Sequence, residues 1–170
     1  MQALLWFFFE LALLRRGPQD LPASPVLLVL FALGGILVGA LNGQEIFGGL
    51  RQAAGANVLD LLLTMTLLFV LLQFKGSAER WQQTTAAFLG IGLLAGVTML
   101  VIGALAEMFN AAELSAFADL LLAIWLHVVL GHILRHALDI PLMAGVVIVL
   151  AYTMMAFNLI IIVFPIAANA

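Results

Sequence analysis

Five long apolar segments fill most of this chain, and short polar or turn-forming segments separate them. Each segment is close to the ~17–25 residues that an α-helix needs to cross the hydrocarbon core of a bilayer. Inside lipid, only helices and closed barrels satisfy their own backbone hydrogen bonds, so the pattern predicts an all-α membrane protein with five transmembrane helices. We place the spans at residues 25–41, 57–74, 84–106, 117–138 and 142–164.

The composition supports this fold class and excludes several others. Hydrophobic residues make up 65% of the 170 residues and charged residues 9%, whereas soluble domains are about half apolar and a quarter charged. The spans use almost the whole chain, so we expect residues 1–170 to form a single membrane domain. The net charge of −3 argues against nucleic acid as a partner, and the absence of cysteine excludes disulfides and thiolate metal sites.

Residues 1–14 are apolar on nearly every side, but as a helix they would extend only about 21 Å, which is too short to span. Trp6 and the aromatic run Phe7-Phe8-Phe9 suit the headgroup boundary, so we predict a short interfacial or re-entrant helix. Two roles stay open for it, a lipid anchor and a docking helix for a partner subunit. The segment lacks a basic region before its apolar run and a small-residue cleavage site, so we expect no signal peptide.

The basic residues predict the orientation of the chain. With five spans, Arg51 alone falls on one side of the membrane. The other basic residues all fall on the opposite side: Arg15, Arg16, Lys75, Arg80 and Arg135. Because basic loop residues stay in the cytoplasm, we expect a cytoplasmic N-terminus and an outer C-terminus, which is periplasmic in a bacterial inner membrane.

Three helix starts have residues suited to capping. Ser24 and Pro25 have the chemistry of an N-cap and of a first helical residue that needs no N–H partner. Asn110 and Glu113 have the spacing of a capping box, so we expect this pair to begin the fourth long helix. We expect Ser77 to cap the third long helix in the same way.

Small residues recur at a spacing of four in two of the spans. They are Gly35, Gly39 and Gly43 in the first span and Gly92 and Gly96 in the third. This GxxxG spacing lets another helix approach closely, and in lipid such packing replaces the missing hydrophobic drive. We favour packing inside this chain's own bundle, and a face for a homodimer or a partner subunit is the alternative.

A few polar side chains fall near the middle of the spans. His127 and Tyr152 come at a similar depth, with Thr64, Thr66 and Thr98 not far off. One interpretation is a proton relay, a small-solute site or a haem ligand, because an ionisable group in hydrocarbon marks a functional site by default. The other is a neutral histidine that bonds Tyr152 or a threonine and fixes the helix register. We favour the second, because a relay normally needs a carboxylate at mid-depth and we expect none there.

Two carboxylates are predicted on the outer side, in the first turns of the second and fourth spans. Asp60 and Asp119 would there meet unpaired N–H groups and the positive end of the helix dipole, which suffices as a structural explanation. If these two helices are neighbours, Asp60, Asp119 and Asn158 would instead form a cation site open to the outside.

His132, His136 and Asp139 follow an i, i+4, i+7 pattern near the cytoplasmic end of the fourth span. Two histidines four apart can bind a metal ion, but three residues spread over two turns rarely all reach it, so we expect no metal. All three histidines of the chain lie on this span, so a bis-histidine haem would need a second chain, and we expect no cofactor. The sequence has no nucleophile elbow, phosphate loop or carboxylate pair, which predicts no catalytic residue.

The polar segment before the first span reads Arg15-Arg16-Gly17-Pro18-Gln19-Asp20-Leu21-Pro22. Together with five closely spaced spans, minimal loops and a cytoplasmic N-terminus, it resembles bacterial members of the Yip1-like family. Membership would imply a five-helix membrane domain. Eukaryotic relatives are tied to vesicle traffic and Rab-type small GTPases, a role we do not expect here because no long cytosolic region precedes the first span.

These observations predict a non-enzymatic scaffold or accessory subunit of a larger complex in the inner membrane. It would dock on other membrane proteins, or on copies of itself, through residues 1–14 and the glycine faces. The main alternative is a small-solute or proton-coupled transporter that uses the polar layer around His127. A weaker alternative is a haem- or quinone-binding subunit of an electron-transfer complex.

Overall fold

The computed structural model describes residues 2–167, and every regular element within that range is helical. The helices are α1 (Gln2–Ala12), α2 (Pro25–Gly43), α3 (Leu50–Lys75), α4 (Trp81–Phe109), α5 (Ala112–Leu138) and α6 (Leu142–Val163). Two short 3-10 segments, η1 (Pro18–Asp20) and η2 (Ala78–Arg80), precede α2 and α4. The predicted fold class, with five long helices after a short N-terminal one, is confirmed.

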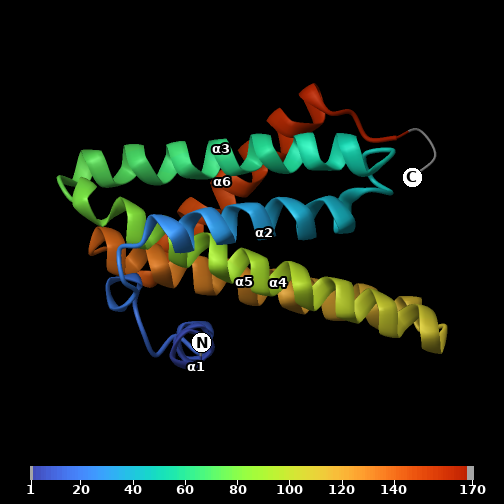
Figure 1. Cartoon of the computed structure of the whole chain (residues 1–170), viewed down its shortest axis with the longest axis horizontal. Coiled ribbons are helices and arrows are strands. Elements are labelled where there is room, and N and C mark those ends of the chain that lie inside the picture. Colours follow the sequence, from blue (N-terminus) through green and yellow to red (C-terminus); the bar gives the residue numbers. More distant parts are fainter. Residues whose placement is uncertain (1, 168–170) are drawn as a thin grey trace.

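The five long helices run up and down in chain order and form one bundle (Figure 1). Each is long and apolar enough to cross a bilayer, so the chain has the fold of a multi-pass membrane protein. The α3–α4 and α5–α6 turns lie together at one end of the bundle. We call this the basic end, because Lys75, Arg80 and Arg135 belong to the helix ends and turns that meet there.

The long helices extend further than their apolar stretches. α3 begins at Leu50 instead of residue 57. Gly49, directly before it, has a φ of 140°, and the polar residues that follow are already helical. α4 and α5 likewise begin at Trp81 and Ala112, ahead of the predicted spans. Hydropathy marks the part of a helix that contacts lipid, and the polar first turns fall outside it.

Of the predicted caps, the one on α2 is confirmed. The Ser24 hydroxyl accepts a hydrogen bond from the N–H of Leu27 at 3.4 Å, and Pro25 is the first helical residue. The capping box at the start of α5 is wrong, because Asn110 adopts a left-handed φ of 52° and ends α4 instead. Asparagine tolerates this conformation better than most residues, which suits it to a helix C-terminus. Ser77 makes no side-chain cap either, since it precedes η2.

α5 and α6 approach each other closely through two glycines that do not belong to a GxxxG pattern. A Cβ atom on Gly145 would overlap the carbonyl oxygen of Gly131, and one on Gly131 would overlap the backbone of Val146. The two backbones therefore meet directly, as small residues allow in membrane helices. The fully buried side chains of the hydrophobic core include Leu68, Ile91 and Ile133.

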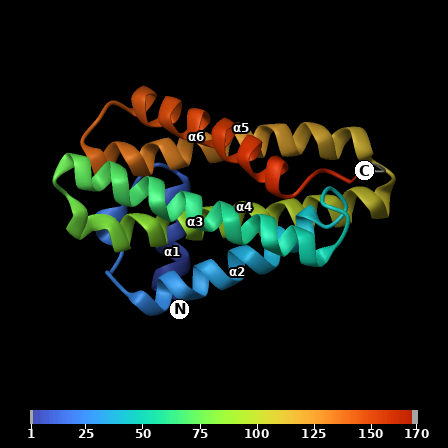
Figure 2. The same cartoon turned by 90° about the horizontal axis from the view of Figure 1, so that it is seen from above.

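The far halves of α4 and α5 extend away from this core. In Figure 2 their hairpin reaches beyond the other helices on the right. None of residues 96–128 is buried, and the exposed side chains there include Val101, Phe109, Leu120 and Ile124. We call residues 96–128 the α4–α5 arm. Its apolar surface is compatible with lipid, with a partner subunit, or with a second copy of the chain.

The short helix α1 runs across the long helices and is seen end-on in Figure 1. Phe8 and Leu11 are buried against the bundle, and the Phe8 ring meets Phe31 edge-on at 5.1 Å between ring centroids. Leu5 and Trp6 remain exposed on its other side. One buried and one exposed apolar face is the arrangement expected of a helix that lies along the membrane interface.

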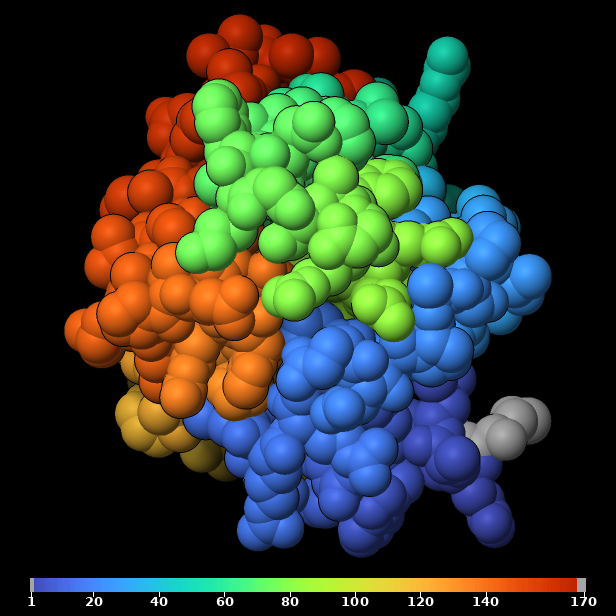
Figure 3. Space-filling view, turned by 90° about the vertical axis from the view of Figure 1, so that its left-hand side faces the viewer, coloured from blue at the N-terminus to red at the C-terminus, as the bar shows by residue number. Residues whose placement is uncertain are grey.

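Side chains of the long helices hold the segment that follows α1. The Trp125 indole donates to the carbonyl of Ala12 at 3.2 Å, and the His132 imidazole donates to the carbonyl of Arg16 at 3.0 Å. The Gln83 amide donates to the carbonyl of Leu21 at 2.9 Å. Figure 3 views the basic end, where this segment, in blue, fills the space below the α3–α4 and α5–α6 turns.

Candidate functional site

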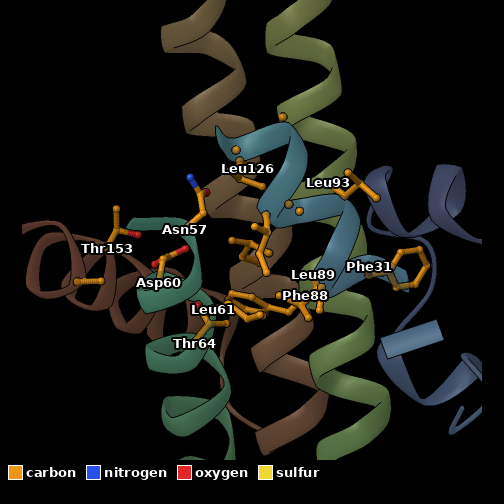
Figure 4. Close-up of a pocket in the computed structure, with 18 of the residues that line it drawn as sticks. Phe31, Asn57, Asp60, Leu61, Thr64, Phe88, Leu89, Leu93, Leu126 and Thr153 are labelled. Atoms are coloured by element: carbon orange, nitrogen blue, oxygen red, sulfur yellow. The ribbon is translucent and has the colours of Figure 1, made fainter. Parts of the chain in front are cut away.

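A cavity of about 360 Å³ lies inside the bundle, and all five long helices contribute to its walls (Figure 4). Its volume is in the range of small-molecule sites in proteins. The walls from α2 and α4 are apolar and include Phe31, Phe88 and Leu93. The polar groups come from α3 and α6, and they are Asn57, Asp60, Thr64, Tyr152 and Thr153.

The polar wall arises from helix periodicity. Asn57, Asp60 and Thr64 are spaced at i, i+3 and i+7, so they share one face of α3. Figure 4 shows these three side chains on the same side of the cavity, across from Phe88, Leu89 and Leu93. A carboxylate, an amide and a hydroxyl of α3 thus face the apolar walls from α2 and α4.

Tyr152 joins α6 to this face by a short chain of hydrogen bonds. Its hydroxyl lies 2.6 Å from the Thr64 hydroxyl, 3.2 Å from a carboxylate oxygen of Asp60 and 3.2 Å from the Asp60 carbonyl. A phenol has one proton to donate. Since Tyr152 donates it to Asp60, Thr64 donates to Tyr152, and the chain runs from Thr64 through Tyr152 to Asp60.

Asp60 lies further along its helix than the sequence predicted. Because α3 begins at Leu50, Asp60 is its eleventh residue, about 15 Å along the axis from that end. The helix dipole acts within the first turn, so the predicted dipole explanation is wrong. The prediction that no carboxylate lies at the level of Tyr152 is also wrong, because the Asp60 carboxylate accepts a hydrogen bond from the Tyr152 hydroxyl. Within residues 2–167, no lysine or arginine pairs with Asp60.

His127 takes no part in this chain of hydrogen bonds. Its Nδ1 lies 2.7 Å from the carbonyl of Ala123, and its Nε2 lies 3.2 Å from the Thr153 hydroxyl. A neutral ring that donates through Nδ1 accepts through Nε2. The structure therefore pairs His127 with a threonine of α6 and not with Tyr152. A threonine was one of the two partners that we expected for a histidine that fixes the helix register.

The remaining polar residues of the predicted layer and of the outer group lie elsewhere. Thr66 and Thr98 donate to carbonyls of their own helices at 2.7 and 2.8 Å. Asn158 is exposed and donates to the carbonyl of Met154. Asp119 is the eighth residue of α5, beyond the first turn, and does not line the cavity. The predicted cation site formed by Asp60, Asp119 and Asn158 together is therefore wrong.

The GxxxG glycines divide into packing and cavity-forming positions. The Asn57 side chain fills the space beside Gly39, Val38 packs on Gly96, and Gly43 packs on Phe47. Gly35 and Gly92 also line the cavity, but no atom lies within 4 Å of a Cβ placed on either one. These two glycines leave the hollow open.

The three predicted metal candidates at the end of α5 do not converge. His132 is buried and its Nε2 is bonded to Arg16, whereas Asp139 lies 3.8 Å from Arg80. The rings of His132 and His136 meet edge-on at 4.5 Å between centroids. Across the part of the chain that the structure describes, no three histidine, aspartate or glutamate side chains cluster closely enough to hold a metal ion.

Comparison with protein-family models, with curated protein sequences and with solved structures finds no match for this chain. The functional argument therefore depends on the cavity itself. Sequence reasoning missed Asn57 and Thr153 as lining residues. The i, i+3, i+7 spacing from Asn57 through Asp60 to Thr64 was the available signal for the first of them.

Proposed function

We propose that this protein is a cation–proton exchanger for small amphiphilic solutes, with the inner cavity as its binding site. The observation behind the proposal is a carboxylate, Asp60, that faces a membrane cavity and has Tyr152 as its side-chain partner. An ionised carboxylate in hydrocarbon is costly unless it is paired. A proton or a bound cation can each neutralise Asp60, so one proton leaves as one monovalent cation binds.

The apolar walls indicate which cations would fit. Phe31, Phe88 and Phe157 all line the cavity, and aromatic faces attract organic cations. Asn57 and Thr153 add hydrogen-bonding groups beside Asp60. A small ammonium compound with hydrocarbon substituents suits this mixture better than a hydrated metal ion, which prefers several oxygen ligands.

We further propose that the membrane is a bacterial inner membrane, with the basic end in the cytoplasm. In this orientation, Asp60 lies nearer the outer ends of the helices, since α3 starts on that side and Lys75 ends it on the other. We expect no chemical conversion of the solute, because the polar cluster contains neither an activated nucleophile nor a cofactor site.

Transport of tetraethylammonium tests the proposal. In proteoliposomes with an acidic interior, the wild type is expected to take up the labelled cation as protons leave. Asp60→Asn keeps the shape of the side chain but cannot exchange a proton, so uptake should fall about tenfold or more. Asp119→Asn is the matched control, since that carboxylate does not line the cavity, and its uptake should equal that of the wild type.

Two results would contradict the exchanger. One is wild-type uptake no faster than in empty liposomes. The other is unchanged uptake by Asp60→Asn in protein that is folded and inserted to the same level.

A second candidate is the accessory subunit, and the α4–α5 arm favours it. None of its residues 96–128 is buried, and Val101, Phe109 and Leu120 are more than half exposed. The apolar face of a partner subunit would cover these side chains. Mild native extraction from the source membranes tests this role. A defined larger complex would support it, whereas a lone monomer would count against it.

A further inference from the structure

A second, polar pocket lies at the basic end of the bundle, apart from the inner cavity. It has a volume of about 290 Å³ and is formed by four segments, η1, η2, the start of α4 and the end of α5. None of its lining residues belongs to the wall of the inner cavity. The polar side chains around it are Gln19, Arg80, Gln83, Thr84, His136 and Asp139.

The pocket contains one positive and one negative side chain that are only loosely paired. Arg80 Nη1 lies 3.8 Å from Asp139 Oδ2, well beyond the ~2.7–2.9 Å of a charge-assisted hydrogen bond. The distance from Arg80 Nε to Glu79 Oε1 is longer still, at 4.0 Å. The guanidinium donors and the carboxylate acceptors are therefore largely free for a ligand.

Two further donors line the same pocket as Arg80. Thr84 is 1% exposed, and its hydroxyl has no hydrogen-bond partner among the described residues, which is unusual for a buried polar group. His136 is held edge-on against His132, whose own Nε2 is already bonded to the Arg16 carbonyl. A ligand with several acceptor oxygens would satisfy Arg80, Thr84 and His136 together.

The depth of the pocket points to the level of the lipid headgroups. Arg80 directly precedes Trp81, whose indole donates to the carbonyl of Met65 at 3.2 Å. Tryptophan and the basic residues of helix ends gather at this level of membrane proteins. Arginine at the start of a helix is also well suited to phosphate oxygens.

We propose that this pocket binds the phosphoethanolamine headgroup of a membrane lipid. The phosphate lies against Arg80, with Thr84 and His136 as additional donors, and the ammonium group lies against Asp139. Asp139 then distinguishes a zwitterionic headgroup from an anionic one, because only the former has a cation to pair with it. This site is independent of the transport proposal.

Native mass spectrometry of protein released from nanodiscs tests the site. The nanodiscs contain equal amounts of phosphatidylethanolamine and phosphatidylglycerol. The wild type is expected to retain several times more phosphatidylethanolamine than phosphatidylglycerol. Arg80→Gln should retain about tenfold less phosphatidylethanolamine than the wild type. Arg51→Gln, which removes a cation at the opposite end, is the matched control and should behave as the wild type.

Asp139→Asn provides the sharper variant. Asp139 has a left-handed φ of 51°, and asparagine accepts that conformation, so the fold should be kept. We expect this variant to retain lipid but to shift its preference toward phosphatidylglycerol, because the partner of the ammonium group is gone.

Equal retention of both lipids by the wild type would overturn the proposal, as would an unchanged preference in Asp139→Asn. A competition arm with soluble phosphoethanolamine distinguishes a lipid from a free headgroup. Removal of the lipid adduct by equimolar soluble compound would overturn the assignment to a membrane lipid. No arm requires transport, so failure here leaves the exchanger untouched, and the reverse also holds.

Discussion

Gly35→Leu is expected to fold normally and to bind tetraethylammonium more weakly. Gly35 lines the inner cavity, and no atom lies within 4 Å of a Cβ at this position, so we expect a leucine side chain to occupy part of the hollow. Leucine is a better helix former than glycine by about 1 kcal/mol, so α2 should not be weakened. Since the cavity would be partly filled, we expect the dissociation constant to rise about tenfold.

Gly103→Leu is the matched control for this substitution. Gly103 also has open space around its Cβ position and also lies within a long helix, but it does not line the cavity. Equilibrium binding of labelled tetraethylammonium to purified protein measures both variants. Equal loss of binding in both, or full binding by folded Gly35→Leu, would mean that the cation binds elsewhere.

Gly145→Ala is expected to destabilise the bundle. The added Cβ would overlap the carbonyl oxygen of Gly131, and backbone atoms cannot move aside as a flexible side chain can. α5 and α6 would have to separate at their crossing, which costs about 1–3 kcal/mol for an overpacked contact. In addition, α6 positions Tyr152 and Thr153, so the polar wall of the cavity should shift with it.

Unfolding in detergent by a denaturant titration measures this effect. Gly103→Ala is the control and should be neutral or slightly stabilising, because alanine is the better helix former and meets no neighbour. If Gly145→Ala were as stable as the wild type, the close crossing of α5 and α6 would be wrong.

The number and class of the helices could be predicted because lipid imposes them. A run of apolar residues near bilayer length has essentially one stable structure, and the five predicted spans correspond to α2–α6. The start of α2 was predictable from local chemistry. The Ser24 hydroxyl accepts a hydrogen bond from one of the first N–H groups, and Pro25 has no N–H that needs a partner.

The depth of Asp60 was not predictable from hydropathy. Arg51 and Gln52 are polar, so the apolar pattern begins after them, yet they form the first turn of α3. Extending the helix backwards moves Asp60 from its first turn to its eleventh residue, where its carboxylate lies beside the Tyr152 hydroxyl. An N-cap signal would have located the start, but Gly49 provides no side chain to cap with.

The pairing of polar groups could not be predicted either, because it depends on how each helix is rotated in the bundle. Tyr152 and Thr153 are adjacent in sequence, so their side chains point about 100° apart around α6. One meets Thr64 and Asp60 of α3, whereas the other meets His127 of α5. His127 therefore pairs with Thr153 and not with its neighbour Tyr152, because only Thr153 faces α5.

The measurement that tests the central claim most directly is carbodiimide labelling of Asp60. Dicyclohexylcarbodiimide enters membranes and reacts with protonated carboxyl groups, and mass spectrometry of peptides locates the product. We predict that Asp60 is labelled in the wild type and that tetraethylammonium protects it, while labelling at Asp119 does not respond to the cation. Labelling of Asp60 that is equally fast with and without tetraethylammonium would contradict a cation site at this carboxylate.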